Sequence, residues 1–295
     1  MKEYAIVSGK GGTGKTSLVA SFAVLANRAV VADCDVDAAD LHLVLAPTVR
    51  RRETFLCGRE AVIRQADCVS CGACLTRCRF GAVRKGEGGA GEARFDIDPN
   101  ACEGCGVCVT QCPVQAIDFP ERASGTWFVS DTRRGPMVHA ELAPGAENSG
   151  KLVAKVREEA RSVGEEHGCA LALVDGPPGI GCAVIAAISG ASLAIVIAEP
   201  TLSGAHDMAR VLALTRHFNI PSAVCVNKWD LNPDMATMIE DEAARGGAVS
   251  VGRVRYDRSV TAAQMQGKAV TELSDALSGP DIRAVWKRIE AMETS

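Results

Sequence analysis

The stretch "SGKGGTGKTS", residues 8–17, decides the fold of this chain. It satisfies the P-loop pattern, and it lies between an apolar strand-like run at 4–8 and a helical pattern at 16–26. Glycines let backbone N–H groups surround phosphates, and the N-terminus of the following helix adds partial positive charge. The pattern predicts that Lys15 reaches the β and γ phosphates of a nucleotide and that Thr16 offers its hydroxyl to Mg²⁺. The expected nucleotide contacts here are Gly9, Lys10, Gly11, Gly12, Thr13, Gly14, Lys15, Thr16 and Ser17.

The rest of the chain repeats the alternation of short apolar runs with helical segments. This alternation predicts buried parallel strands separated by helices. We therefore expect an α/β fold with the parallel sheet of a P-loop NTPase. With 295 residues, the chain has room for one large domain and a small one. The predicted later strands are 29–33, 170–175, 193–200, 222–227 and 248–252.

Composition restricts the partners and the compartment. A formal net charge of −4 and a pI near 5.8 give no overall basic field, so nucleic acid is not expected as a partner. The most apolar region, 169–198, is interrupted by Asp175 and two prolines, so no stable membrane insertion is expected. No secretory pattern opens the sequence, and we expect a cytoplasmic protein. Thirteen cysteines in a reducing compartment indicate metal binding before disulfides.

Two cysteine runs interrupt the α/β pattern. "CVSCGACLTRCRFGAV" (68–83) and "CEGCGVCVTQCPVQAI" (102–117) align with all four cysteines in register. The spacing C-x₂-C-x₂-C-x₃-C, present twice, is typical of bacterial two-cluster ferredoxins, in which the fourth cysteine of each run ligates the other cluster. Zinc is the alternative, but it favours closed sets of four from separated pairs. The expected ligands of two [4Fe–4S] clusters are Cys68, Cys71, Cys74 and Cys112 for one, and Cys102, Cys105, Cys108 and Cys78 for the other.

The cysteine runs define an expected inserted domain. We predict a small α+β ferredoxin-like domain at 57–122, which divides the ATPase domain into 1–56 and 123–295. A glycine-rich linker at 85–95 separates the two runs, and a hairpin at 125–142 leads back into the sheet. Arg79 stands where Pro113 follows the other run, and its positive charge should favour the reduced state of the cluster that Cys78 ligates. Since the insert has few aliphatic residues, we expect its folding to depend on its clusters.

The form "KGGTGKT" (10–16) resembles the deviant P-loop of the ParA/MinD-type ATPases, to which the nitrogenase iron protein also belongs. The resemblance implies a nucleotide-dependent homodimer in which Lys10 acts on the phosphates bound by the second subunit. "VVADCDVDAADL" (30–41) resembles the first switch of that family, with Asp35 orienting the attacking water. "LALVDGPPGIG" (171–181) resembles the second switch, with Asp175 holding a Mg²⁺-bound water and Gly179 contacting the γ-phosphate through its backbone. The neighbouring Asp33 and Asp37 have helix capping as an alternative role.

"VCVNKWD" (224–230) is similar to the base-binding turn of the same family, with Asn227 facing the purine and Lys228 beside it. Asn227-Lys228-x-Asp230 also fits the guanine signature of GTPases, so GTP remains an alternative to ATP. The residues at 251–257 are expected to close over the base. A second stretch, 145–152, imitates a P-loop, but Leu152 stands where Mg²⁺ needs a hydroxyl. We expect this stretch to begin a helix capped by Asn148 or Ser149.

The remaining cysteines include no C-x₂-C pair of the kind that Mrp-type cluster-carrier ATPases of this superfamily use. Cys182 lies seven residues after Asp175, similar to a cluster ligand of the nitrogenase iron protein, but the second cysteine of that arrangement has no counterpart here, so we expect Cys182 to be a small buried residue. The C-terminal segment spaces apolar residues along one helical face, and we expect it to pack on the domain.

Together these features predict a P-loop ATPase that carries two [4Fe–4S] clusters, ATP and Mg²⁺. Its catalytic residues are expected to be Lys10, Lys15, Asp35 and Asp175. The first functional hypothesis is nucleotide-gated electron transfer between the clusters and an unknown redox partner. The alternatives are an ATP-dependent scaffold that assembles iron–sulfur cofactors for an apo-protein, and a redox-sensing ParA/MinD-like positioning switch.

Overall fold

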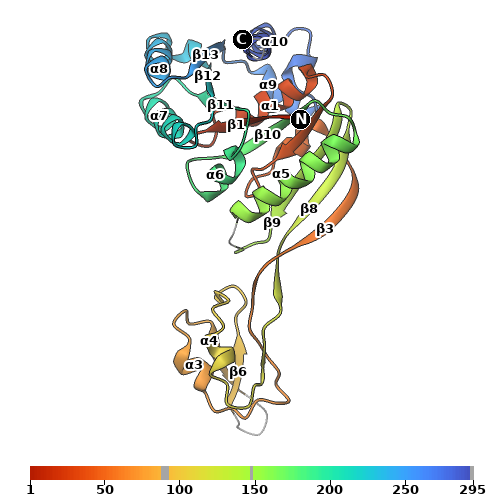
Figure 1. The fold of residues 1–295 in the computed structure, drawn as a ribbon, viewed down its shortest axis with the longest axis vertical. Coiled ribbons are helices and arrows are strands. Elements are labelled where there is room, and N and C mark those ends of the chain that lie inside the picture. Colours follow the sequence, from red (N-terminus) through yellow and green to blue (C-terminus); the bar gives the residue numbers. More distant parts are fainter. Residues whose placement is uncertain (88–92, 147–148, 293–295) are drawn as a thin grey trace. The chain divides into compact units, whose positions relative to one another are not determined.

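The computed structural model describes residues 1–87, 93–146 and 149–292, and the chain forms two compact units (Figure 1). The first unit comprises Met1–Glu53, Thr126–Leu142 and Ser149–Ser295, and the second comprises Thr54–Gly125 and Ala143–Asn148. Part of the predicted linker at 85–95 lies outside the described residues, as does the predicted cap Asn148. The two units are described separately below.

A mostly parallel sheet forms the centre of the first unit. Over the described residues it has nine strands in the order β13-β12-β11-β1-β10-β2-β9-β8-β3, and every neighbouring pair from β13 to β9 is parallel. The predicted parallel α/β sheet is therefore confirmed. Its strands are β1 (Lys2–Ser8), β2 (Ala29–Asp33), β3 (Thr48–Arg59), β8 (Glu121–Thr132), β9 (Gly135–Leu142), β10 (Leu171–Pro178), β11 (Leu193–Ala198), β12 (Ser222–Asn227) and β13 (Val249–Val254).

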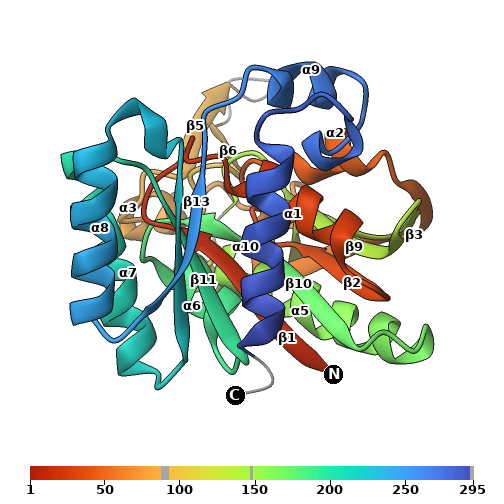
Figure 2. The ribbon, with the colours of Figure 1, turned by 90° about the horizontal axis from the view of Figure 1, so that it is seen from above.

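Helices cover both faces of this sheet (Figure 2). The face that carries Tyr4 and Ile6 packs against α1 and α10, and the other face packs against α5, α6 and α7. As predicted, the C-terminal helix packs on the domain, with the Trp286 ring tilted by 30° against that of Phe22 at 5.2 Å between centroids. The helices of this unit are α1 (Lys15–Leu25), α2 (Leu41–Leu45), α5 (Ser149–Glu166), α6 (Cys182–Ile188), α7 (Leu202–His217), α8 (Pro233–Arg245), α9 (Ser259–Met265) and α10 (Gly279–Ala291), with short 3₁₀ turns η2 (Trp229–Leu231) and η3 (Val270–Glu272).

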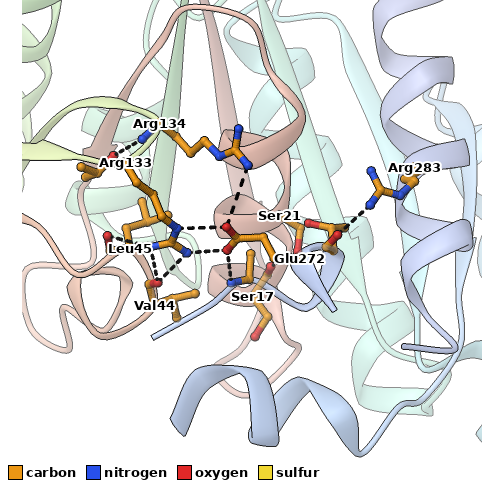
Figure 3. Close-up of polar contacts among 11 residues, drawn as sticks. Ser17, Ser21, Val44, Leu45, Arg133, Arg134, Glu272 and Arg283 are labelled. Carbon is orange, nitrogen blue, oxygen red and sulfur yellow. Dashed lines mark hydrogen bonds and ion pairs between the residues drawn. The ribbon is translucent and has the colours of Figure 1, made fainter. Parts of the chain in front are cut away.

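Strands β8 and β9 form the predicted hairpin, and its turn is anchored by Arg133 (Figure 3). The Arg133 guanidinium donates to the backbone oxygens of Val44 at 3.2 Å and Leu45 at 2.9 Å, where α2 ends. It also pairs with the carboxylate of Glu272 in η3, and this ion pair raises the pKa of Arg133. One side chain thus ties the hairpin turn to α2 and to the segment that follows α9.

The second unit is built from two short helices and two small antiparallel sheets. Strand β4 (Val62–Ile63) pairs with β7 (Ile117–Asp118), and β5 (Val83–Glu87) pairs with β6 (Ala93–Ile97). Helices α3 (Ala73–Arg77) and α4 (Val107–Thr110) each follow a glycine with φ of 72°, in the left-handed region that favours glycine. The two cysteine runs therefore fold into the same local structure. The buried apolar core is small: Ala61, Ile63, Cys74, Val83, Phe95 and Ile117.

Candidate functional site

The P-loop connects β1 to α1, and its glycines have identifiable physical roles. A Cβ on Gly9 would lie 2.3 Å from the Cβ of Asp207, so only glycine allows α7 to approach this closely. Gly14 has a φ of +84°, and a Cβ there would lie 2.4 Å from Nδ2 of Asn227. Helix α1 has no acidic residue in its first turn. Its N-terminal N–H groups are therefore available to an anion without a competing carboxylate on the same turn.

A cavity of about 340 Å³ lies over the P-loop. The predicted loop residues Gly11 to Ser17 line it, together with Asp35 from the predicted first switch. Pro178, at the end of β10, contributes from the predicted second switch. The volume falls in the usual range of small-molecule sites. The other lining residues are Ser8, Ala38, Asp40 and Gln264.

Lys15 is buried against two carboxylates. Its Nζ pairs closely with Oδ1 of Asp175 and lies 3.5 Å from Oδ2 of Asp35. Burial alone would disfavour the ammonium, but the neighbouring carboxylates outweigh it and raise the pKa of Lys15. Burial also raises the pKa of Asp35, against the opposing effect of Lys15. The structure thus brings three of the four predicted catalytic residues into one contact cluster.

Asp33 lies beneath this cluster at the end of β2. Its carboxylate accepts the N–H of Asp35 and the N–H of Leu41, each at 3.2 Å, so it caps the start of α2 as the alternative role proposed. Complete burial, together with the nearby Asp175, raises its pKa well above the ordinary value. Asp33 therefore stabilises the conformation of the loop between β2 and α2 and is not among the residues that line the cavity.

Two buried oxygens near the phosphate cavity have no hydrogen-bond partner: Oδ2 of Asp175 and Oγ1 of Thr13. Buried polar atoms are normally paired, so an unpartnered oxygen at a binding site indicates a missing ligand or water. A Mg²⁺-bound water that donates a hydrogen bond to Oδ2 of Asp175 would satisfy one of these two oxygens. Thr16, the predicted hydroxyl ligand of Mg²⁺, lines the same cavity. These residues fit a magnesium nucleotide.

Gly179 is also near the site, but its N–H is already used. It donates to the backbone oxygen of Ser8 at 2.9 Å, where β10 runs beside β1. A contact from this N–H to a γ-phosphate therefore requires the Ser8 bond to break. The sequence could not reveal this local pairing, because it depends on the register between two distant strands.

A second cavity, of about 300 Å³, adjoins the first and shares Gly12, Gly14, Ser17 and Gln264 with it. The predicted base-side residues lie here, with Arg255, Tyr256 and Asp257 of the 251–257 loop along one wall. Hydrogen bonds from Ser259 and Ser278 outweigh the effect of burial and lower the pKa of Asp257 to about 2. The Asp257 carboxylate is therefore an anchor for the loop, held by four donors.

Asn227 and Lys228 support the P-loop from the base side. Nδ2 of Asn227 donates to the backbone oxygen of Thr13 at 2.7 Å, and Nζ of Lys228 donates to that of Gly12 at 2.9 Å. Both residues line the second cavity. Asp230, the third residue of the guanine signature, accepts the N–H of Tyr256 at 2.6 Å, so one of its two oxygens is occupied.

Two residues of the site were not predicted. Gln264 lines both cavities and donates to Oγ of Ser17 at 3.0 Å, but nothing in the sequence around it signals a ligand contact. Glu199 pairs with Lys10 at 3.1 Å and with Lys228 at 2.7 Å. Its position directly after β11, at the carboxyl end of a parallel strand, is a place where α/β sheets bind ligands, and this signal was available.

In the second unit, the eight predicted cysteines line two cavities. Each cavity takes three cysteines from one run and the fourth from the other run, and the remaining walls are largely apolar. Within the part of the chain that the structure describes, no three or more His, Cys, Asp or Glu side chains are grouped so that they could hold one metal ion. The cysteine groups are Cys68, Cys71, Cys74 and Cys112 in one cavity, and Cys78, Cys102, Cys105 and Cys108 in the other.

The fourth cysteine of each run has a different environment. Burial opposes ionisation of Cys78, but backbone hydrogen bonds from Phe80, Val83, Ala82 and Gly81 prevail and lower its pKa. Its counterpart Cys112 accepts the N–H of Ala116 at 3.3 Å. Pro113, which follows Cys112, has no N–H to offer. The residue after the fourth cysteine thus differs between the runs, Arg79 in one and Pro113 in the other.

The prediction that Cys182 is buried is wrong. Its side chain is exposed at the first residue of α6, directly after the second switch. Gly150 of α5 lies beside it, since a Cβ on Gly150 would be 3.4 Å from the backbone of Cys182. The stretch that imitates a P-loop begins α5 at Ser149 and buries Leu152, which agrees with the predicted helix start. The apolar context of Cys182 belongs to the following turns of α6, which bury Val184 and Ile188 instead.

None of the helices described in residues 1–87, 93–146 and 149–292 has the length and apolar character needed to cross a lipid bilayer.

Known proteins match most of the chain. The family described as the CobQ/CobB/MinD/ParA nucleotide binding domain matches residues 4–270. An uncharacterized protein of Methanocaldococcus jannaschii is 35% identical over 234 residues, which cover 78% of this chain and 79% of that protein. A second uncharacterized protein of the same organism is 26% identical over 238 residues, covering 79% of this chain and 82% of its own length.

Solved structures share the fold at low sequence identity. The MinC:MinD cell division complex of Aquifex aeolicus gives a TM-score of 0.59 at 18% identity, covering 99% of this chain and 96% of that one. The septum site-determining protein MinD of Pyrococcus horikoshii, solved with Mg-ADP, gives 0.60 at 14% identity, covering 99% and 97%. A ParA family ATPase of Chlorobium tepidum gives 0.55 at 13% identity, with 98% of both chains covered.

Proposed function

The chain belongs to the CobQ/CobB/MinD/ParA family of P-loop ATPases, and we propose that it is an ATP-hydrolysing iron–sulfur protein. In this proposal its nucleotide state controls electron transfer between two [4Fe–4S] clusters and a redox partner. The observation that carries the proposal is the pair of four-cysteine cavities in a chain that also has a complete P-loop site.

The contacts of Lys15 support a role for nucleotide binding in preparing the hydrolytic site. Lys15 pairs with Asp175 and Asp35. If Lys15 turned to the phosphates of a nucleotide, both carboxylates would lose this partner. Asp175 would then hold a Mg²⁺-bound water, and Asp35 would orient the attacking water toward the γ-phosphate. In this proposal, phosphate binding by Lys15 and the loss of its ion pairs with Asp175 and Asp35 occur together.

The composition of the two cysteine cavities supports [4Fe–4S] clusters rather than single ions. A single zinc ion draws its ligand sulfurs to within about 2.3 Å of one point, whereas a cubane attaches each cysteine to a different iron. The crossed grouping, three cysteines from one run and one from the other, is that of two-cluster ferredoxins. When bound, such clusters supply one-electron transfer. The ligands in this proposal are Cys68, Cys71, Cys74 and Cys112, and Cys102, Cys105, Cys108 and Cys78.

The position of the cysteine runs in the sequence supports coupling between the two chemistries. Both runs lie between Asp35 and Asp175, which belong to the two proposed switches. Strands β3 and β8 each contribute residues to both units. We further propose that two chains associate when nucleotide is bound, with Lys10 of each acting on the phosphates of the other. Closure of such a dimer would move the two switches, and the second unit lies between them in the sequence.

Chemical analysis tests the cluster part of this proposal first. Protein purified without oxygen should contain two [4Fe–4S] clusters per chain, detected as iron, acid-labile sulfide and the EPR signal of the reduced clusters. Stoichiometric zinc without sulfide would contradict it.

The gating part is tested by Asp35→Ala, which removes the water-orienting carboxylate. We expect this variant to bind ATP but to hydrolyse it at least about a hundredfold more slowly, and to lose ATP-dependent reduction of a redox partner or of a dye acceptor. The control is Asp37→Ala, on the same loop. Undiminished ATP-dependent reduction in Asp35→Ala would overturn gating by hydrolysis.

The fold supports one further candidate, a redox-sensing positioning switch. Its basis is the likeness to MinD and to the Cyanothece McdA, with TM-scores of 0.58 and 0.57. A switch needs clusters whose oxidation state changes ATP hydrolysis or dimerisation, without electron delivery. Equal ATPase rates with oxidised and with reduced clusters would exclude it. Release of iron to an apo-acceptor in the presence of ATP would instead indicate an assembly scaffold.

A further inference from the structure

Glu199 is a charged residue of the nucleotide site to which no part of the mechanism above assigns a role. It follows β11 directly, and the next residues start α7, where Oγ1 of Thr201 accepts the N–H of Gly204 at 2.9 Å. Its carboxylate is only 15% exposed. The polypeptide therefore places this carboxylate at the carboxyl end of the sheet, beside the P-loop.

The two oxygens of Glu199 neutralise two lysines from opposite sides. Oε1 accepts from Nζ of Lys228 at 2.7 Å, and Oε2 lies 3.1 Å from Nζ of Lys10. Both pairings lower the pKa of Glu199 against the effect of burial. A carboxylate that bridges two ammonium groups stays ionised, and its charge-assisted hydrogen bonds hold both ammonium groups in place.

Lys10 has three polar partners within its own chain. Besides Glu199, its Nζ lies 3.2 Å from Oγ of Ser203 and 3.5 Å from Oγ1 of Thr201. An ammonium has three N–H donors, so these three acceptors together compete with any other acceptor for Lys10. Lys10 must give up this set before it can contact phosphates bound by a second chain.

Lys228 connects the same carboxylate to the base side of the site. Its Nζ donates to the backbone oxygen of Gly12 as well as to Glu199, and it lines the base cavity. Its backbone has a φ of +59°, unusual for a residue with a side chain, so it is held in place by its surroundings. The contacts of the Lys228 ammonium, at 2.7 and 2.9 Å, are shorter than those of Lys10, at 3.1 to 3.5 Å, so Lys10 is the partner of Glu199 that can leave.

We propose that Glu199 is a positioning residue that restrains Lys10 within its own chain, and that departure of Lys10 from Glu199 is a step of nucleotide-dependent dimerisation. This inference rests on the proposed trans role of Lys10. Glu199 then opposes association of chains without nucleotide, because the ion pair must break before the phosphates of the other chain provide a replacement.

The test is Glu199→Gln, measured as ATPase rate against protein concentration and as dimer formation with a non-hydrolysable Mg·ATP analogue. Glutamine keeps an oxygen for Lys228 but cannot neutralise both lysines. We expect the protein concentration for half-maximal rate to fall by about fivefold, the size of one partly exposed ion pair. The ATPase rate at saturating protein concentration should change by a smaller factor. A general loss of structure would instead lower this saturating rate. Ser203→Ala, which removes an uncharged acceptor of Lys10, should shift the concentration less in the same direction.

A double-mutant cycle with Lys10→Ala separates this inference from the proposed function. If Lys10 is the residue restrained, Glu199→Gln has no further effect in the Lys10→Ala background. If Lys10→Ala abolishes dimer-dependent hydrolysis while Glu199→Gln leaves the concentration dependence unchanged, the role of Glu199 is overturned and the trans role of Lys10 stands. If Lys10→Ala has no effect on dimerisation, both are overturned. An equal shift by Glu199→Gln with and without Lys10 also overturns the restraint.

Discussion

The nucleotide site of the first unit and the cysteine cavities of the second prepare for their ligands in opposite ways. In the first unit, charged groups are paired with one another before any nucleotide binds: Lys15 with Asp175, and Lys10 and Lys228 with Glu199. These groups rest on a large apolar core to which both α1 and α10 contribute. Phosphates must therefore displace internal partners, but the unit does not need them in order to fold.

In the second unit, the cysteines that we propose as cluster ligands belong to the core or pack against it. Cys74 is one of its six buried core residues, and Cys68, Cys78, Cys102, Cys108 and Cys112 pack against them. A core this small provides little apolar burial, and metal binding supplies folding free energy in such domains. The contrast indicates that the first unit has a stability of its own, whereas the second depends on its ligand.

The largest effect should come from removing iron. Chelation under anaerobic conditions, or Cys74→Ser combined with Cys108→Ser, should unfold the second unit, because its core then consists of a few aliphatic side chains around unligated thiols. Limited proteolysis is expected to cut between residues 54 and 125 while the affinity for Mg·ATP remains. The matched control is Cys225→Ser in β12, a buried cysteine outside the unit. Resistance of the iron-free second unit to protease would break the comparison.

Next in size is the loss of the buried ammonium in the first unit. Lys15→Ala leaves the carboxylates of Asp175 and Asp35 unpaired and should lower the free energy of unfolding of the first unit by about 3–5 kcal/mol at neutral pH. Nucleotide binding should be lost as well. Denaturant titration measures the stability change, and isothermal calorimetry measures the binding.

The matched control for that change is Lys151→Ala, an exposed lysine of the stretch that imitates a P-loop. It should change the free energy of unfolding by less than about 0.5 kcal/mol. Equal stabilities of the two variants would show that the ion pairs of Lys15 contribute nothing to the first unit.

A change of pH should also act on the first unit through His139. Burial, and to a lesser extent His42, lowers the pKa of His139 to about 4, while its ring stacks on Phe128 and pairs with Ser130. The folded pKa lies below the unfolded value, so the unfolded state binds more protons as pH falls below about 6.5. Stability is full above that pH and should decline by about 3 kcal/mol as pH approaches 4.

His139→Gln should flatten this part of the pH profile, measured by denaturant unfolding at several pH values. The exposed His217→Gln serves as the control. A profile of unchanged slope in His139→Gln would assign the pH dependence to other titratable groups of the first unit.

The smallest effect concerns a difference within the second unit. Arg79→Pro makes the first run resemble the second and removes a positive charge beside Cys78. It should lower the potential of the cluster proposed there by some tens of millivolts, because that charge favours the reduced state. Redox titration followed by EPR checks this, with Arg77→Ala as a nearby control. An equal change in the potentials of both clusters would contradict a local effect of the Arg79 charge on the cluster at Cys78.

Motifs fixed by backbone chemistry could be predicted from the sequence. This holds for the P-loop, the parallel strands and the hairpin at 125–142, because glycine placement and apolar periodicity act over a few residues. Contacts that depend on distant segments could not. The pairing of Lys15 with Asp175 joins residues 160 positions apart, and the N–H of Gly179 is taken by Ser8 through strand register.

Exposure was also misjudged where the periodicity was short. Cys182 begins a helix of seven residues, and two turns give too little pattern to distinguish its buried face from its exposed one. The internal counter-ion Glu199 was missed because a lysine inside a P-loop was considered only in relation to phosphate.

The most direct test of the account is an EPR-monitored redox titration of anaerobically purified protein, without nucleotide and with a non-hydrolysable Mg·ATP analogue. If nucleotide and cluster states are coupled, at least one midpoint potential shifts when the analogue binds, and by linkage the reduced and oxidised proteins bind it with different affinities. The shift should be absent in Lys15→Ala. Potentials that stay the same while the analogue is demonstrably bound would contradict thermodynamic coupling of the ATPase to the clusters.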